Sequence, residues 1–143
     1  MNREIKFRGK SFVTNEWVYG SLVRTMNESC IIGFNEMELD GHHIKYCNDR
    51  PVFTEQETIG QFIGLCDKNG KKIFEDDILR VYDGERYFNI VVKWSEKAMA
   101  FMACYCDGNQ SPLSWFSGLL SRTHEIEVIG NIYDNKELLE DVK

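Results

Sequence analysis

The chain has 143 residues, 43% of them hydrophobic and 28% charged, and its formal net charge is −6. This composition is typical of one globular domain, which we expect to span residues 1–143, and the acidic balance argues against a protein that coats nucleic acid. No apolar run approaches the roughly 20 residues of a membrane helix, and the first ten residues lack the apolar core of a signal peptide. We therefore expect a cytoplasmic protein without membrane contact.

The first part of the chain is predicted to form short strands. Three stretches carry the alternating or β-branched and aromatic pattern of a strand: residues 5–9, 16–23 and 30–34. Residues 35–50 are polar, with a turn signal at Asp40-Gly41, and we expect an exposed hairpin or loop there. Pro51 suits an edge strand or the first position of a strand.

The stretch from residue 58 to residue 81 predicts a hairpin followed by a corner. An apolar run over 59–65 leads into Asp-Lys-Asn-Gly at 67–70, where the aspartate can cap its own turn and Asn-Gly tolerates positive φ. After the turn, an acidic corner at 75–77 precedes another apolar strand over 78–81.

The last part of the chain predicts further strands and some helix. Strand patterns recur over three stretches: residues 86–94, 99–106 and 125–133. Apolar residues in 114–120 have helical spacing, and a closing helix is expected to start near Asp134, which with Glu137 can form a capping box.

Many short strands, frequent turn signals and little helix predict an all-β fold. We expect a partly open, strongly bent β-barrel of short antiparallel strands with one or two short helices near the C-terminus, because closure removes exposed sheet edges. Residues 57–62 (ETIGQF) and 127–132 (EVIGNI) also match in character, which neighbouring positions in one sheet would explain.

Three separated blocks of the sequence are REIKFRGK with the following WVYG, the central IGQFIGLCDKNGKKIFEDDILRV, and the later IEVIGNIYDN. In this order they resemble the YopX protein family of phage and prophage genomes. The resemblance implies a small, mostly β, partly open barrel made in the bacterial cytoplasm from phage-derived genes, in a family not characterised as enzymes. The chain departs from the family where Asp76 replaces a usual glycine and where Lys136 replaces a common proline.

The residues that suggest metal or catalytic chemistry lack the patterns that such chemistry needs. The turn at 67–70 has its glycine at position four rather than six and no acid at position twelve, so it is not a calcium loop. The candidate zinc ligands are Cys104 with Cys106, His42 and His43 with Cys47, and His124. A zinc site needs a second ligand pair at CxxC or HxxxH spacing, and the sequence contains none beside Cys104 and Cys106. The five cysteines are an odd number in a chain without an export signal, so we expect reduced thiols. The acidic corner at 75–77 is better explained by side chains that cap backbone N–H groups. We expect no cofactor, no metal and no catalytic residue.

Basic and aromatic residues near the N-terminus form one candidate binding face. Lys6, Arg8 and Lys10 alternate onto one face of the first predicted strand, near Trp17 and Tyr19. Small β-barrels often present such a face to single-stranded nucleic acid. The alternative is a solvated outer face with the aromatic residues inward, and the acidic remainder of the chain opposes approach to phosphates.

These observations predict a non-enzymatic protein-interaction module whose partner is an unknown host or phage protein. Phage accessory proteins of this size often act by binding another protein, and exposed β edges support strand addition or self-association into a homo-oligomer. Nucleic-acid binding through the basic and aromatic face is the second hypothesis, and a metal-dependent enzyme is the third.

Overall fold

A computed structural model gives the structure of residues 3–32, 34–39, 42–47, 51–105, 107–113 and 125–140, and for residues 32, 34–39, 42–47 and 140 it describes the backbone alone. The chain divides into two compact units, residues 1–62 and residues 63–143. The expectation of a single domain over residues 1–143 stays a prediction. The predicted helix at 114–120 lies outside the described residues.

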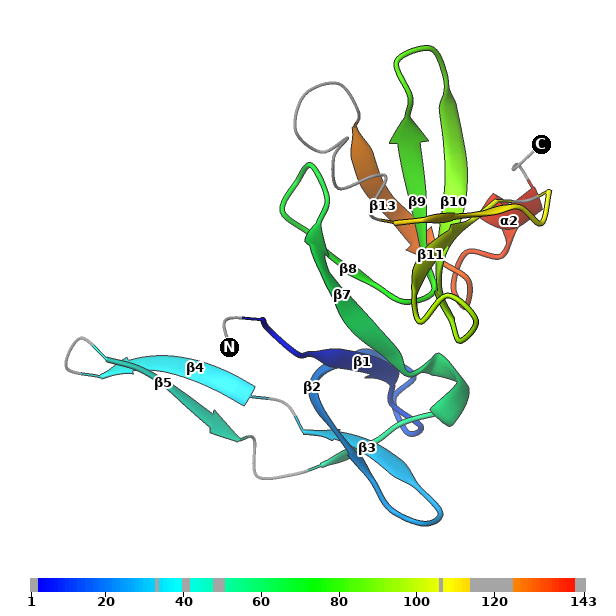
Figure 1. Cartoon of the computed structure of the whole chain (residues 1–143). Helices are drawn as coiled ribbons and strands as arrows, with labels where there is room; N and C mark the ends of the chain where they lie inside the picture. The colour runs from blue at the N-terminus through cyan, green and yellow to red at the C-terminus, as the bar shows by residue number, and fades with distance from the viewer. Residues whose placement is uncertain are drawn as a thin grey trace. The chain divides into compact units, whose positions relative to one another are not determined.

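The first unit is built from short antiparallel strands (Figure 1). They are β1 (Phe7–Lys10), β2 (Trp17–Arg24), β3 (Ser29–Ile32), β4 (Phe34–Leu39), β5 (His42–Cys47) and β6 (Val52–Phe53), followed by the 3-10 helix η1 (Gln56–Thr58) and the start of β7 (Gly60–Cys66). The strands pair in the order β6-β3-β2-β1, and β1 also pairs with Gly60 and Gln61 of β7. Strands β4 and β5 form a separate two-stranded hairpin.

The sheet of the first unit curls back toward its own first strand. Ser11, which follows β1, forms an antiparallel bridge with Thr54, which follows β6, and the N–H of Glu55 donates to the carbonyl of Lys10 at 3.0 Å. Glycine suits this close approach, because a Cβ at Gly9 would lie 3.1 Å from the Thr54 Cβ and one of the two strands would have to shift slightly. Ser11, Thr54 and Ile31 are buried on the inner face of this curl.

The second unit contains a five-stranded antiparallel sheet in the order β12-β11-β10-β9-β13 (Figure 1). Its elements are the end of β7, then β8 (Lys72–Phe74), β9 (Asp77–Tyr82), β10 (Tyr87–Ser95), β11 (Ala100–Cys104), β12 (Gln110–Pro112), β13 (Ile126–Asn131) and the helix α2 (Glu137–Glu140). One face of the sheet forms the core because alternate residues of each strand are apolar. The buried members of this core are Ile73, Leu79, Val81, Ile90, Val92, Ala103, Leu113, Ile126 and Val128.

Two turns of the second unit are fixed by aspartate side chains, as the sequence predicted. Asp67 Oδ1 accepts the N–H groups of Asn69 and Lys71 at 2.8 and 2.9 Å, and Gly70 has a φ of 79°. At the acidic corner, Asp77 Oδ2 accepts the N–H of Phe74 at 2.8 Å. Short carboxylate side chains satisfy backbone donors that a tight turn leaves without a strand partner.

The all-β prediction is confirmed, but the expected barrel needs correction. The described strands form two antiparallel sheets and a hairpin rather than a closed barrel, because the pairing is divided between separate sheets. In the part of the chain that the structure describes, one short C-terminal helix is present, and it starts at Glu137 rather than near Asp134. The similar segments 57–62 and 127–132 are not sheet neighbours, since β13 pairs with β9 and β7 pairs with β1. Among the described residues, helices are too short and polar to cross a membrane.

Candidate functional site

The pairing of β1 with β2 brings the predicted basic and aromatic residues onto one face. Arg8 lies opposite Tyr19 and Lys10 lies opposite Trp17. Directly opposed residues of antiparallel strands share a face, so these four side chains lie on the same side of the sheet. Lys6 precedes β1, and its carbonyl accepts the N–H of Phe62 at 2.8 Å. Because the inner face carries Ser11 and Thr54, the four residues belong to the outer face of the curled sheet.

Trp17 is engaged by both cations of this outer face. The Arg8 Cζ lies 4.6 Å from the centre of the indole ring, and the Lys10 Nζ lies 5.7 Å from it. Both are within the range of cation–π attraction. Arg8 is only 5% exposed, so its guanidinium is held within the unit beside the ring. The basic part of the predicted face therefore contributes to folding as well as to surface charge.

The strand register adds an apolar row to the outer face that the sequence did not reveal. Val23 lies opposite Cys30, Cys30 lies opposite Phe53, and the Ser11–Thr54 bridge places Phe12 opposite Phe53. The row crosses from β2 to the segment after β1, and we call Val23, Cys30, Phe53 and Phe12 the apolar row. Phe12 and Phe53 are 75% and 50% exposed, and Val23 is 39% exposed.

The apolar row could not be found from sequence because its members lie in four different segments. Phe12 follows a predicted strand, Val23 ends another, and Phe53 stands next to Pro51 and Val52. Each residue is unremarkable in its own segment, since single exposed apolar side chains are common on protein surfaces. Only the register, which depends on loop lengths and on the curl of the sheet, places them side by side.

The acidic corner of the second unit is a structural junction. Asp76 has a φ of 68°, in the left-handed region that favours glycine, and aspartate is one of the few other residues that adopt it readily. The Asp76 Oδ1 lies 2.6 Å from Lys93 Nζ, and its Oδ2 accepts the hydroxyl of Tyr133 at 2.8 Å. The expectation of a side chain that caps a backbone N–H at this corner is met by Asp77, whereas the Asp76 carboxylate contacts the side chains of Lys93 and Tyr133.

No group of three or more histidine, cysteine or acidic side chains that could hold a metal occurs within the described part of the chain. Of the predicted zinc candidates, only Cys104 has a described side chain; Cys106, His124 and the side chains of His42, His43 and Cys47 lie outside the description. Burial raises the pKa of the Cys104 thiol, and nearby Lys93 offsets this only in part. A thiol with a raised pKa is a poor nucleophile at neutral pH.

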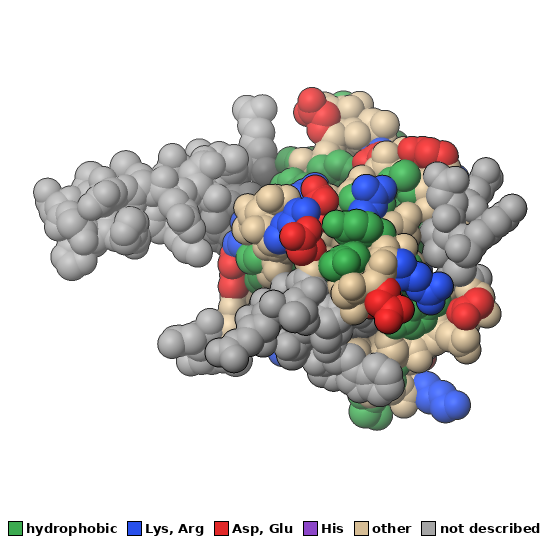
Figure 2. All heavy atoms as spheres, turned by 90° about the horizontal axis from the view of Figure 1, so that it is seen from above, with side chains coloured by type: hydrophobic (Ala, Val, Ile, Leu, Met, Phe, Trp, Pro, Cys, Tyr) green, Lys and Arg blue, Asp and Glu red, His purple; other side chains and the backbone are tan. Residues whose placement is uncertain are grey.

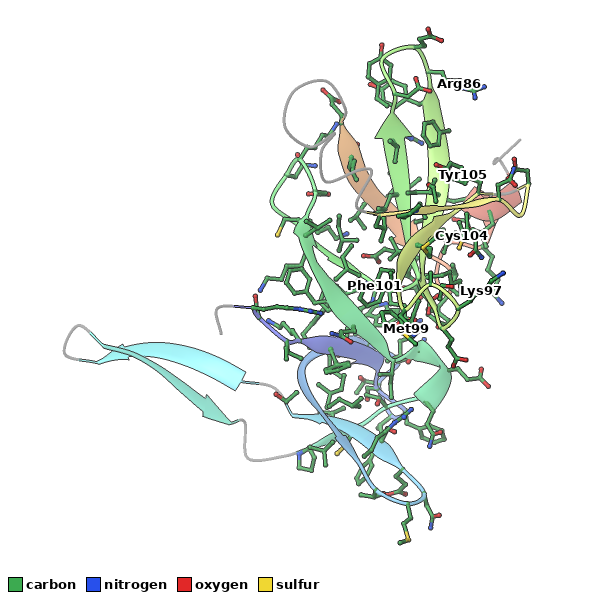
Figure 3. The ribbon with its side chains drawn as sticks, in the orientation of Figure 1. Arg86, Lys97, Met99, Phe101, Cys104 and Tyr105 are labelled. Atoms are coloured by element: carbon green, nitrogen blue, oxygen red, sulfur yellow. The ribbon has the colours of Figure 1, made fainter. Side chains whose placement is uncertain are left out.

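The second unit presents its own exposed apolar tip. Met99 and Lys97 lie in the turn between β10 and β11, and Phe101 follows on β11 (Figure 3). Met99 is 82% exposed and has a φ of 50°, while Trp94 packs edge-on against Phe101 with ring centres 5.1 Å apart. Because Trp94 lies opposite Phe101 at the end of the core face, this tip extends the core into solvent.

The comparisons with known proteins agree with this architecture. The profile of the YopX protein family matches residues 6–140. The chain is also similar to the crystal structure of protein EF1440 from Enterococcus faecalis, with a TM-score of 0.57 and 26% sequence identity over 96% of this chain and 99% of that chain. No functionally curated protein matches the chain. Since the family match covers nearly its whole length, the chain belongs to the YopX protein family.

Proposed function

We propose that this protein is a non-enzymatic protein-interaction module that binds a protein partner through the outer face of the first unit. The outer face comprises Tyr19 and the apolar row, beside the Arg8–Trp17–Lys10 cluster. The family's link to phage and prophage genomes suggests an accessory protein that acts on a host or phage protein in the bacterial cytoplasm.

The observation that carries the proposal is the apolar row on the outer side of a curled sheet. An inner face needs apolar residues for the core, whereas an outer face does not. Here Phe12, Phe53 and Val23 remain exposed, and the buried Cys30 links Val23 on β2 to Phe53 on β6. Exposed apolar residues that gather on one surface mark interaction sites more often than scattered ones do.

The same face supports nucleic-acid binding less well. Base stacking needs an open aromatic ring, yet Trp17 already has Arg8 and Lys10 over its ring. Arg8 is buried, which keeps its guanidinium from reaching phosphates, and the chain as a whole carries −6. Seen from above, as in Figure 2, the molecule shows acidic and basic side chains interspersed with hydrophobic ones. A mixed surface of this kind suits a protein partner better than a polyanion.

Two observations support a role without catalysis. The Asp76 carboxylate of the acidic corner is engaged by Lys93 and Tyr133, and Asp77 holds the backbone N–H of Phe74. The Cys104 thiol has a raised pKa because it is partly buried. A general base or nucleophile would need an accessible group with a pKa matched to its task.

The test is capture of partners from bacterial lysate by the tagged protein, with and without nuclease, read by mass spectrometry. We expect a protein partner that survives nuclease and is lost with the Phe53→Ser variant. The matched control is Tyr87→Ser, because Tyr87 is 59% exposed in the second unit. Partners that vanish with nuclease would favour nucleic-acid binding instead. A partner retained equally by both variants would place the site away from the outer face.

A further inference from the structure

The turn between β1 and β2 exposes two bulky apolar residues next to each other. Phe12 is 75% exposed and Val13 is 87% exposed. Turns usually carry Gly, Pro, Asn, Asp or Ser, each for a conformational reason. Phenylalanine and valine are not in this group, so their presence at this turn calls for a reason outside turn chemistry.

The hydrogen bonds of this turn are made by backbone groups and the Ser11 hydroxyl, so the Phe12 and Val13 side chains are not needed to close it. The N–H of Ser11 donates to the carbonyl of Glu16 and the N–H of Asn15 donates to the carbonyl of Ser11, both at 2.9 Å. Ser11 Oγ accepts the N–H groups of Val13 and Thr14 at 3.3 and 3.2 Å. Asn15 takes the left-handed position, with a φ of 58°. Because the Phe12 and Val13 side chains are largely solvated, burial contributes little stability at either residue.

The turn is also held against the neighbouring strand. The N–H of Phe12 donates to the carbonyl of Phe53 at 3.0 Å, directly beside the Ser11–Thr54 bridge. This bond fixes the backbone from which Phe12 and Val13 project. A surface that is ordered before binding loses less conformational entropy in a complex. Such preordering is typical of residues that anchor an interface.

The size and shape of this surface limit its partner. Phe12, Val13 and Phe53 together offer on the order of 300 Å² of apolar area, because an aromatic side chain buries roughly 150–250 Å² when it is fully covered. A stable flat interface needs about 800 Å² per partner, so this surface is too small by itself to hold any flat partner, a second copy of the chain included. A turn tip is convex, and a small convex apolar surface binds strongly only when a pocket surrounds it.

We infer that the Phe12–Val13 turn is an anchor that inserts into a concave apolar pocket on a partner protein. This inference rests on the proposed function, to which it adds the contacting residues and the shape of the partner's site. Phe53 flanks the anchor at the rim of the pocket. The outer face beyond it then supplies the weaker surrounding contacts.

The first experiment places a benzophenone amino acid at position 12 of the full chain and cross-links it by light in bacterial cells. Position 69 is the control, because Asn69 is also an exposed turn residue. We expect a cross-link from position 12 that is absent from position 69 and that maps to apolar pocket residues of another protein. A cross-link to nucleic acid, to a second copy of this chain or to a flat polar surface would overturn the inference. Equal labelling from both positions would do so too.

The second experiment measures the affinity of the purified cross-linked protein for variants. Phe12→Ser with Val13→Ser should weaken binding by roughly 100-fold, as expected for a pair of anchor residues. Met99→Ser, a matched change at the exposed tip of the second unit, should leave the affinity within about twofold. Val13→Lys is a second variant, used in case the double variant unfolds. It should also abolish tight binding, because it would place a charge in the apolar pocket.

Cross-linking from position 19, where Tyr19 is exposed on the outer face, separates the anchor from the proposed function. If a protein partner cross-links from position 19 but not from position 12, and the double variant binds normally, the anchor is wrong and the outer face still binds protein. If neither position yields a protein cross-link, the proposed function fails as well.

Discussion

Asp67 and Val128 are joined across 61 residues of sequence, because Asp67 Oδ2 accepts the N–H of Val128 at 3.0 Å. The other oxygen of the same carboxylate closes the turn after β7. The N–H of Lys68 in turn donates to the carbonyl of Ile126 at 2.9 Å. The turn at 67–70 therefore satisfies backbone groups along the outer edge of β13, where an added strand would otherwise pair.

Asp67→Asn should destabilise the protein by about 1–3 kcal/mol. The single amide oxygen can serve either the turn or Val128, and the amide NH₂ would then face a backbone donor. Urea unfolding of the variant against wild type at neutral pH measures the loss. Equal midpoints would show that the turn and β13 do not depend on the carboxylate.

The stability contributed by Asp67 should depend on pH in the acid range. Burial by itself would raise the pKa of Asp67, but the N–H bonds from Val128, Lys71 and Asn69 outweigh it and lower the pKa below 3.8. A carboxyl group whose pKa is lower in the folded than in the unfolded state binds fewer protons when the protein is folded. Its contribution to the free energy of unfolding is therefore complete above the unfolded-state pKa and is lost as the pH falls through the folded-state pKa.

The measurement is the difference in unfolding free energy between wild type and Asp67→Asn, followed from about pH 6 to about pH 2.5. We expect this difference to be constant at the upper end and to shrink below pH 3.8. A difference that stays constant over the whole range would contradict the assignment. Asp83→Asn is a parallel case rather than a control, because N–H bonds from Arg86 and Glu85 also lower the pKa of Asp83.

Gly130→Ala should destabilise the protein by about 1–3 kcal/mol through a steric clash. A Cβ at Gly130 would lie 2.4 Å from Asn135 Oδ1, which accepts the N–H of Asn131. Asn135 would have to move and give up that bond. Chemical denaturation of the single variant measures the cost.

The matched test of the clash is Gly130→Ala in an Asn135→Ala background. Asn135→Ala removes the two atoms that the new Cβ would approach most closely and leaves only the Asn135 Cβ, at 3.0 Å. Gly130→Ala should therefore cost much less in this background than it does in wild type. Additive costs would show that Gly130 is needed for its backbone conformation rather than for space.

Tyr133→Phe should cost about 1 kcal/mol, because it removes the hydroxyl that donates to Asp76. Asp76→Ala should cost more, since it removes this bond and the Lys93 ion pair and places alanine at a φ of 68°. Asp76→Gly should lie between the two, because glycine adopts that conformation freely. An Asp76→Gly variant less stable than Asp76→Ala would contradict the strain argument.

Ser11→Ala should cost about 0.5–2 kcal/mol, as the loss of a capping hydroxyl does elsewhere. The Ser11 Oγ accepts two N–H groups of the turn that carries Phe12 and Val13. Amide hydrogen exchange at Val13 and Thr14 should rise in the variant, with little change at Leu79 in the core of the second unit. Unchanged exchange at both turn residues would mean that the hydroxyl does not order the turn.

The sequence by itself determined the local structure of this protein. Alternating side chains specified the strands, and the Asp67 turn and the corner at Asp77 followed from side chains that reach backbone donors two to four residues away. Such interactions depend only on near neighbours in the chain, so they can be read without knowledge of the fold. The face shared by Lys10 and Trp17 was also predictable, because a short turn joins their strands.

The tertiary structure decided which distant residues meet. Phe12, Val23 and Phe53 form one row only through two strand pairings and a bridge, and Asp67 reaches Val128 only once both elements are folded. The burial of Arg8 beside Trp17 was likewise invisible in a pattern that predicted an exposed basic face. A register shift of one residue would exchange the two faces of a strand, and loop lengths and core packing set that register.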